Sequence, residues 1–144
     1  MDKFEERIRP IQAISREESL RFELSSIQVQ YVENDLQLIL NCWYQSTKKS
    51  RKLCVDFGTV AMFKSVFDFW HYAEFDDECD LVLDKKEKGI YPFYEIYPSY
   101  WIKRMRTKMP DHVDLNHYCF LSLDHIVDVL AYKHSPPKFE WLND

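Results

Sequence analysis

The chain has 144 residues, of which 46% are hydrophobic and 30% are charged, a balance typical of a folded globular protein and unlike that of a disordered one. Its length predicts a single domain spanning residues 1–144, large enough to bury a core. The formal net charge of -5 argues against general nucleic-acid binding, which needs a broad basic face to neutralise phosphates.

The N-terminal half predicts a hairpin followed by further strands. The first twenty residues mix charges with isolated isoleucines, so we expect a poorly packed N-terminal segment there. Apolar and polar residues alternate over Phe22–Tyr31 and again over Leu36–Cys42, with turn-forming residues between them, which indicates a hairpin. A third strand is predicted from Leu53 and ends at Gly58. Val60–Trp70 fits a helix or a strand, and its Val and Phe content favours a strand.

The C-terminal half predicts two strands and the clearest helix. Tyr91–Tyr97 is interpreted as a strand at a sheet edge, because it is bounded by prolines that cannot donate to a ladder. Ser99 is a good N-cap for a helix over Tyr100–Met109. Tyr118–Leu121 is an apolar run typical of a central strand, and Ile126–Tyr132 fits a strand or a short helix. Together these elements predict an α+β fold, a mainly antiparallel sheet with at least one covering helix.

The residues give little sign of metal or cofactor chemistry. Residues 74–89 form a charged segment that we expect to be an exposed loop, and an EF-hand register laid over it fails because Leu81 stands where glycine is required. His112 and His117 lack the spacing of a zinc helix. The four cysteines, at positions 42, 54, 79 and 119, form no close pair and are expected to be reduced thiols. We therefore expect no metal and no cofactor.

The sequence also favours a non-enzymatic role. No nucleophile elbow is present, and Cys119 lies between aromatic residues in the most apolar strand, where a thiol is expected to be inert. Residues 1–6 are acidic and no apolar run approaches the roughly 20 residues that span a bilayer, so we expect no signal peptide and a cytoplasmic protein.

Two segments are candidates for binding a partner. The acidic run contains Asp76, Asp77 and Glu78, which can attract a basic surface over long range. The run of residues 90–101 holds six aromatic residues, and Tyr and Trp are enriched at interfaces. We therefore take as speculative contact residues Asp76, Asp77, Glu78, Tyr94, Tyr97 and Trp101.

The order of the elements carries a resemblance. A hairpin, the strand around Leu53–Phe57, an aromatic strand leading into Ser99–Ile102, then His117–Phe120 and Asp124–Ala131 resemble small uncharacterised bacterial domains. Some of these domains are similar in size and acidity to toxin-neutralising immunity proteins. The resemblance covers the C-terminal two thirds of the chain and carries no catalytic residue over.

Two functional hypotheses follow. The first is a cytoplasmic protein-interaction module of the immunity type, which binds a protein partner with a basic surface; a homodimer remains open. The alternative is a small enzyme or ligand-binding domain whose pocket is lined by histidines and aromatic residues. Converged His and carboxylate groups in a deep cleft would favour the alternative, and a flat acidic and aromatic surface would favour the first.

Overall fold

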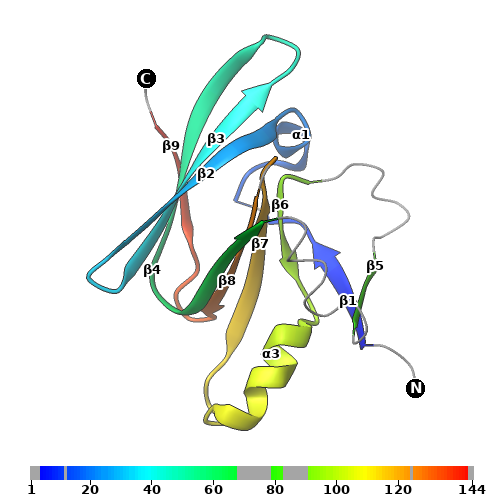
Figure 1. Cartoon of the computed structure of the whole chain (residues 1–144), viewed down its shortest axis with the longest axis vertical. Helices are drawn as coiled ribbons and strands as arrows, with labels where there is room; N and C mark the ends of the chain where they lie inside the picture. Colours follow the sequence, from blue (N-terminus) through cyan, green and yellow to red (C-terminus); the bar gives the residue numbers. More distant parts are fainter. Residues whose placement is uncertain (1–3, 12, 68–78, 83–90, 124, 143–144) are drawn as a thin grey trace.

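The computed structural model describes residues 4–11, 13–67, 79–82, 91–123 and 125–142 (Figure 1). In this part the chain is mainly antiparallel β-sheet with few helices, as expected. The predicted hairpin is confirmed. Strands β2 (Glu23–Val32) and β3 (Asp35–Tyr44) pair in antiparallel fashion, and the turn residues Glu33 and Asn34 both have positive φ angles, 52° and 70°. Asparagine tolerates this left-handed conformation, which matches the twist of the two strands.

Strand β4 (Lys49–Phe67) is longer than predicted. It does not end at Gly58 but continues through it, so the predicted third strand and the Val60–Trp70 segment form one element as far as Phe67; residues 68–70 lie outside the described part. Gly58 takes a φ of 63° and its N–H donates to Asp56 Oδ1 at 3.0 Å, next to an irregularity in the pairing with β3. The prediction of a strand after Val60 is therefore confirmed as far as Phe67, and the prediction that the third strand ends at Gly58 is wrong.

The two halves of β4 pair with different neighbours. The first half lies between β3 and β9 (Lys138–Leu142), and the second half pairs with β8 (His125–Tyr132). β8 settles the open choice for Ile126–Tyr132 in favour of a strand. It pairs in turn with β7 (Leu115–Leu121), which is a central strand as predicted.

The aromatic strand is not at an edge. β6 (Phe93–Ile96) pairs with β7 on one side and with β1 (Phe4–Arg9) on the other. β1 also pairs in parallel with β5 (Cys79–Val82), a strand within the segment that we predicted to be a loop. The prolines flank β6 rather than interrupt it, which is why they did not mark an edge. The sheet order is β2-β3-β4-β8-β7-β6-β1-β5, with β9 beside β4.

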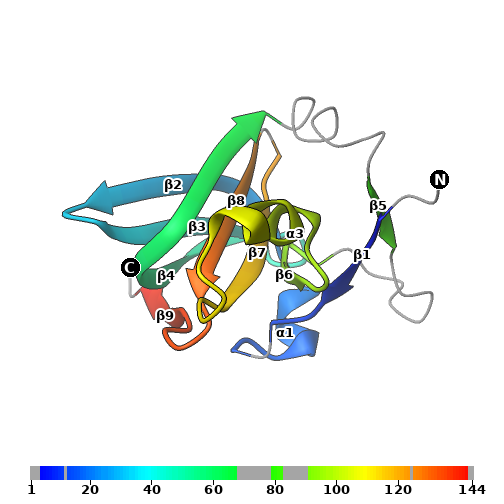
Figure 2. The ribbon, with the colours of Figure 1, turned by 90° about the horizontal axis from the view of Figure 1, so that it is seen from below.

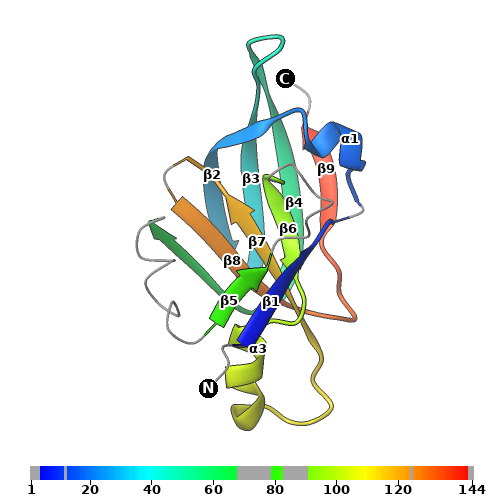
Figure 3. The ribbon, with the colours of Figure 1, turned by 90° about the vertical axis from the view of Figure 1, so that its right-hand side faces the viewer.

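The described helices are short. Ser99 caps α3 (Tyr100–Met105) by accepting the Ile102 N–H at 3.2 Å, as predicted, and the last predicted turn is the 3-10 helix η1 (Arg106–Lys108). Figure 3 shows α3 at one end of the sheet, where it contacts β1 and β7. None of its residues is fully buried. A single turn, α1 (Arg16–Ser19), precedes β2.

The main core lies between the two parts of the sheet that β4 joins (Figures 1 and 3). Leu38 and Val55 enter it from one part, and Phe120 and Val129 from the other. A second cluster, which includes Tyr94 and Cys119, lies on the opposite face of β6, β7 and β8. Both faces of these strands are thus buried, which accounts for the high aromatic content.

The N-terminal segment contributes to the core. Ile14 is buried in the main cluster and Ile11 packs against it, while Ile8 packs against the second cluster. At these positions the segment is packed, in contrast to the poor packing that we expected. Figure 2 places the β1–β5 pair and the β2–β3 hairpin at opposite ends of the molecule.

Gly58 supplies a first testable prediction. A Cβ atom added at Gly58 meets nothing within 4 Å, so Gly58→Ala should cost only the left-handed backbone strain, roughly 1–2 kcal/mol of unfolding free energy. Gly58→Asn should cost less, because asparagine tolerates this conformation. Urea unfolding of both variants checks the order, and an unchanged stability of Gly58→Ala would contradict it.

Candidate functional site

The three predicted contact residues that the structure describes differ in their exposure to solvent. Tyr97 is 62% exposed, and the Arg9 guanidinium lies 4.6 Å from its ring centroid. Tyr94 is only 5% exposed and belongs to the second core cluster, so it is not available as a surface anchor. Trp101 is half-buried, with its ring 5.5 Å from that of His117. Asp76, Asp77 and Glu78 lie outside the described residues.

The structure brings together three polar side chains that the sequence had not linked. The Ser99 Oγ is 2.7 Å from His117 Nδ1, and His117 Nε2 is 2.7 Å from Asp128 Oδ1. The three come from the α3 N-cap, from β7 and from β8. The tautomer of the ring sets the direction of both bonds: with the proton on Nε2, the ring donates to Asp128 Oδ1, and Nδ1 accepts from the Ser99 hydroxyl. We call this group the buried polar network.

The surroundings of the network are closed. Asp128 is 0% exposed, His117 5% and Ser99 6%. Lys64, opposite Asp128 in the pairing of β4 with β8, holds its Nζ 4.8 Å from the Trp101 ring centroid. Cys119 lies opposite Asp128 in the pairing of β7 with β8; burial, together with the Asp128 charge, raises the pKa of its thiol well above the usual value. A raised pKa lowers the thiolate fraction that an attacking thiol needs, and the inertness of Cys119 stays a prediction.

The network has the composition of a serine–histidine–aspartate triad, but its placement favours a structural role. A catalytic serine must reach its substrate, whereas the Ser99 hydroxyl is buried and also accepts the Ile102 N–H. The same bonds join the start of α3 to the β7–β8 pair. His and carboxylate therefore converge as the alternative hypothesis requires, but on buried side chains, and we interpret the network as the tie that holds α3 in place.

The outer edge of β2 is a second feature of the surface. Leu24 makes an isolated parallel bridge to Ser122, and beyond it no described strand pairs with this edge as far as Val32. A cavity of about 400 Å³ lies at the bridge, lined by Phe22, Glu23, Leu24, Tyr91, Pro92, Leu121, Ser122 and Leu123. Leu123, at its rim, is 72% exposed.

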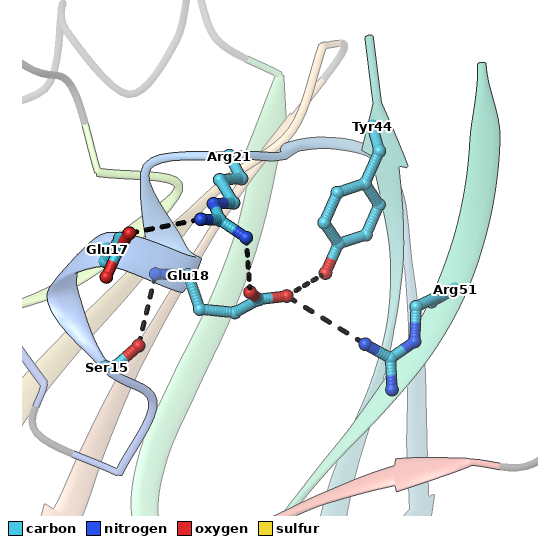
Figure 4. Close-up of polar contacts among 6 residues, drawn as sticks. All are labelled: Ser15, Glu17, Glu18, Arg21, Tyr44 and Arg51. Carbon is cyan, nitrogen blue, oxygen red and sulfur yellow. Dashed lines mark hydrogen bonds and ion pairs between the residues drawn. The ribbon is translucent and has the colours of Figure 1, made fainter. Parts of the chain in front are cut away.

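A third feature is a polar cavity of about 480 Å³ between α1 and the turn that joins β3 to β4. Glu18 is one of its lining residues, and Glu18 Oε1 accepts from the Tyr44 hydroxyl at 2.6 Å (Figure 4). Burial and this bond raise the pKa of Tyr44. Arg21 and Arg51 approach the same carboxylate, each at 3.9 Å. We call this the α1 cavity.

Within the described ranges, no group of three or more His, Cys, Asp or Glu side chains is arranged to hold a metal ion. No helix in this part of the chain has the length and apolar character needed to cross a membrane. No protein-family model, curated protein or solved structure matches the chain.

The sequence identified Ser99 as an N-cap and considered His117 only as a zinc ligand, while Asp128 lies within the predicted Ile126–Tyr132 segment. These two are eleven positions apart, and nothing in their spacing joins them. What brings them together is the antiparallel pairing of β7 with β8, which also sets Cys119 opposite Asp128. The available signal was that a polar residue, His117 or Asp128, interrupts each of two mainly apolar strands.

The structural reading of the network predicts that Asp128→Asn destabilises the fold by roughly 1–3 kcal/mol, the cost of disturbing a buried hydrogen-bonded group. Asp114→Asn is the matched control, because Asp114 is exposed and pairs with Arg106 at 3.7 Å; it should change stability by less than about 0.5 kcal/mol. Urea unfolding measures both. A fluorophosphonate probe should leave Ser99 unlabelled, and labelling that Ser99→Ala abolishes would show instead that the network is catalytic.

Cys42 predicts a loss of stability in alkali. Burial raises the pKa of its thiol to about 12 from 9.0, so above pH 9 the unfolded chain loses a proton that the folded chain keeps. Wild-type stability should therefore fall relative to Cys42→Ala by up to about 1.4 kcal/mol per pH unit. Unfolding of the wild type and of Cys42→Ala should be compared between pH 9 and the pKa of the thiol in the folded state. The difference isolates the effect of Cys42, because all other groups titrate in both proteins. Parallel curves would contradict the shift.

Proposed function

We propose that this chain is a non-enzymatic protein-interaction module that accepts an extended segment of a partner protein along the outer edge of β2. The observation that carries the proposal is the edge from Ser26 to Val32, with which none of the described strands pairs and which ends at the cavity beside Leu24. A row of free backbone N–H and C=O groups is a template for another strand.

The composition of β2 supports this role. Edge strands are usually protected by lysine, proline or inward-pointing charge. β2 contains no lysine and no proline, and its single charged residue is Glu23, at the first position of the strand. Its exposed side chains beyond the bridge include Gln28 and Val32, which do not repel an incoming strand.

The cavity beside Leu24 gives the edge a specific end. Its lining from Phe22, Leu24 and Tyr91 is mostly apolar, so it suits an apolar side chain of the bound segment. The exposed Leu123 at the rim offers further apolar contact. Backbone pairing supplies affinity in this mode of recognition, and a side-chain pocket supplies specificity.

The sequence supports a basic protein as the partner. The acidic run with Asp76, Asp77 and Glu78 favours a basic partner, because opposite charge speeds encounter. Tyr97 remains an exposed aromatic residue that suits a second contact. With the resemblance described above, the proposal is an immunity-type protein that acts in the cytoplasm on a basic toxin; pairing of two copies through β2 is the competing use of the same edge.

The test uses the product of the gene adjacent to that of this chain, purified and titrated into it by calorimetry. Hydrogen exchange of the complex should show new protection over Ser26–Val32. Gln28→Lys combined with Gln30→Lys, both on β2, should weaken binding about tenfold, or about 1.4 kcal/mol.

Gln37→Lys is the matched control, since Gln37 lies opposite Gln30 on the inner strand β3, and it should bind as the wild type does. Protection confined to another part of the chain would overturn the edge assignment. Sedimentation of the chain alone distinguishes the homodimer: a dimer that the β2 double variant dissociates would replace the toxin proposal.

A further inference from the structure

The α1 cavity is positively charged on an acidic protein. Its lining includes three cationic side chains, Arg21, Lys49 and Arg51, and one carboxylate, Glu18. Glu17 adds a second carboxylate, which meets Arg21 at 3.1 Å. Even with both counted, cations outnumber carboxylates by three to two, whereas the whole chain carries a net charge of -5.

The two arginines are held in position before any ligand arrives. Arg51 stacks on Trp141, with the guanidinium carbon 4.0 Å from the ring centroid, and its Nη1 lies 3.9 Å from Glu18. Arg21 is bound between Glu17 and Glu18. Glu18 in turn is fixed by Tyr44 and by the Ser15 Oγ, which accepts its backbone N–H at 3.1 Å (Figure 4). Such fixing reduces the ordering cost of binding.

Both guanidinium groups keep donors for a ligand. Each carries five N–H groups, and the contacts at 3.9 Å to Glu18 are longer than hydrogen bonds. The side chains are accessible, at 60% for Arg21 and 49% for Arg51. Lys49 makes no ion pair with any described residue, and the hydroxyls of Ser46, Thr47 and Ser50 add neutral donors to the same cavity.

We propose that the α1 cavity binds a phosphorylated small molecule through its phosphate group. Planar guanidinium forks match phosphate oxygens, and a lysine adds a point charge. A volume of about 480 Å³ exceeds what a phosphate alone fills and lies in the range of small-molecule sites. The cavity lies beside the β3–β4 turn, away from the free stretch of β2, so this inference is independent of partner binding.

Inorganic pyrophosphate is the probe, titrated by calorimetry and by nitrogen-edited NMR of the arginine side chains at low ionic strength. The wild type should bind with shifts at Arg21 and Arg51. Lys49→Gln should weaken binding severalfold and Arg51→Ala about tenfold or more. Arg51→Lys, which keeps the charge but loses the fork, should also weaken it, and it guards against unfolding caused by loss of the Trp141 contact.

Lys138→Gln is the matched control, because Lys138 is an exposed lysine on β9 that lies outside the cavity. The Lys138→Gln variant should bind pyrophosphate as tightly as the wild type does. Equal weakening by the control would show non-specific attraction and overturn the proposal. So would the absence of binding in the wild type, or sulfate binding as tight as pyrophosphate, which would make the cavity a general anion site.

Discussion

The fold depends on one strand that serves two parts of a sheet. β4 pairs with β9 up to Asp56 and with β3 up to Thr59, and it pairs with β8 from Val60 onward. This change of partners lies next to Gly58, where the backbone takes a left-handed conformation. Leu53 and Val55 enter the main core before the change, and Val60 enters it afterwards. A strand that changes neighbours at a bend or bulge lets two sheet faces close on a shared core. The edge of β2 and the position of β8 both follow from this arrangement.

Burial decides whether the buried polar network is interpreted as catalytic or as structural. Ser99, His117 and Asp128 have the bonds of a proton relay, yet they have almost no exposed surface. In such surroundings a hydrogen-bonded polar network fixes geometry, because breaking either bond leaves a buried group unpaired. α3 is only six residues long and has no fully buried residue, so it gains from a bonded attachment to β7. The residues of a triad and the function of a triad are therefore separable.

The free stretch of β2 and the α1 cavity adjoin different turns of the β2–β3–β4 strands. The free stretch of β2 runs to the turn that precedes β3, and the α1 cavity adjoins the turn that follows it. Their chemistry differs as well. The edge offers backbone groups and an apolar pocket, whereas the cavity offers fixed cations. In the two proposals, a basic protein and a phosphorylated small molecule would therefore use chemically different groups of this acidic chain.

The sequence by itself determined the local elements. Alternation predicted the β2–β3 hairpin, Ser99 predicted the start of α3, and the apolar run predicted β7, because these depend on neighbours a few residues apart. Tertiary structure alone decided that Gly58 bends a strand instead of ending it and that β6 lies between β7 and β1. It also decided the meeting of His117 with Asp128 and the grouping of Arg21 with Arg51, since strand pairing and packing join residues that are distant in sequence. Tyr94 shows the limit most directly: its residue type suggested a surface anchor, and its place on an internal strand buried it.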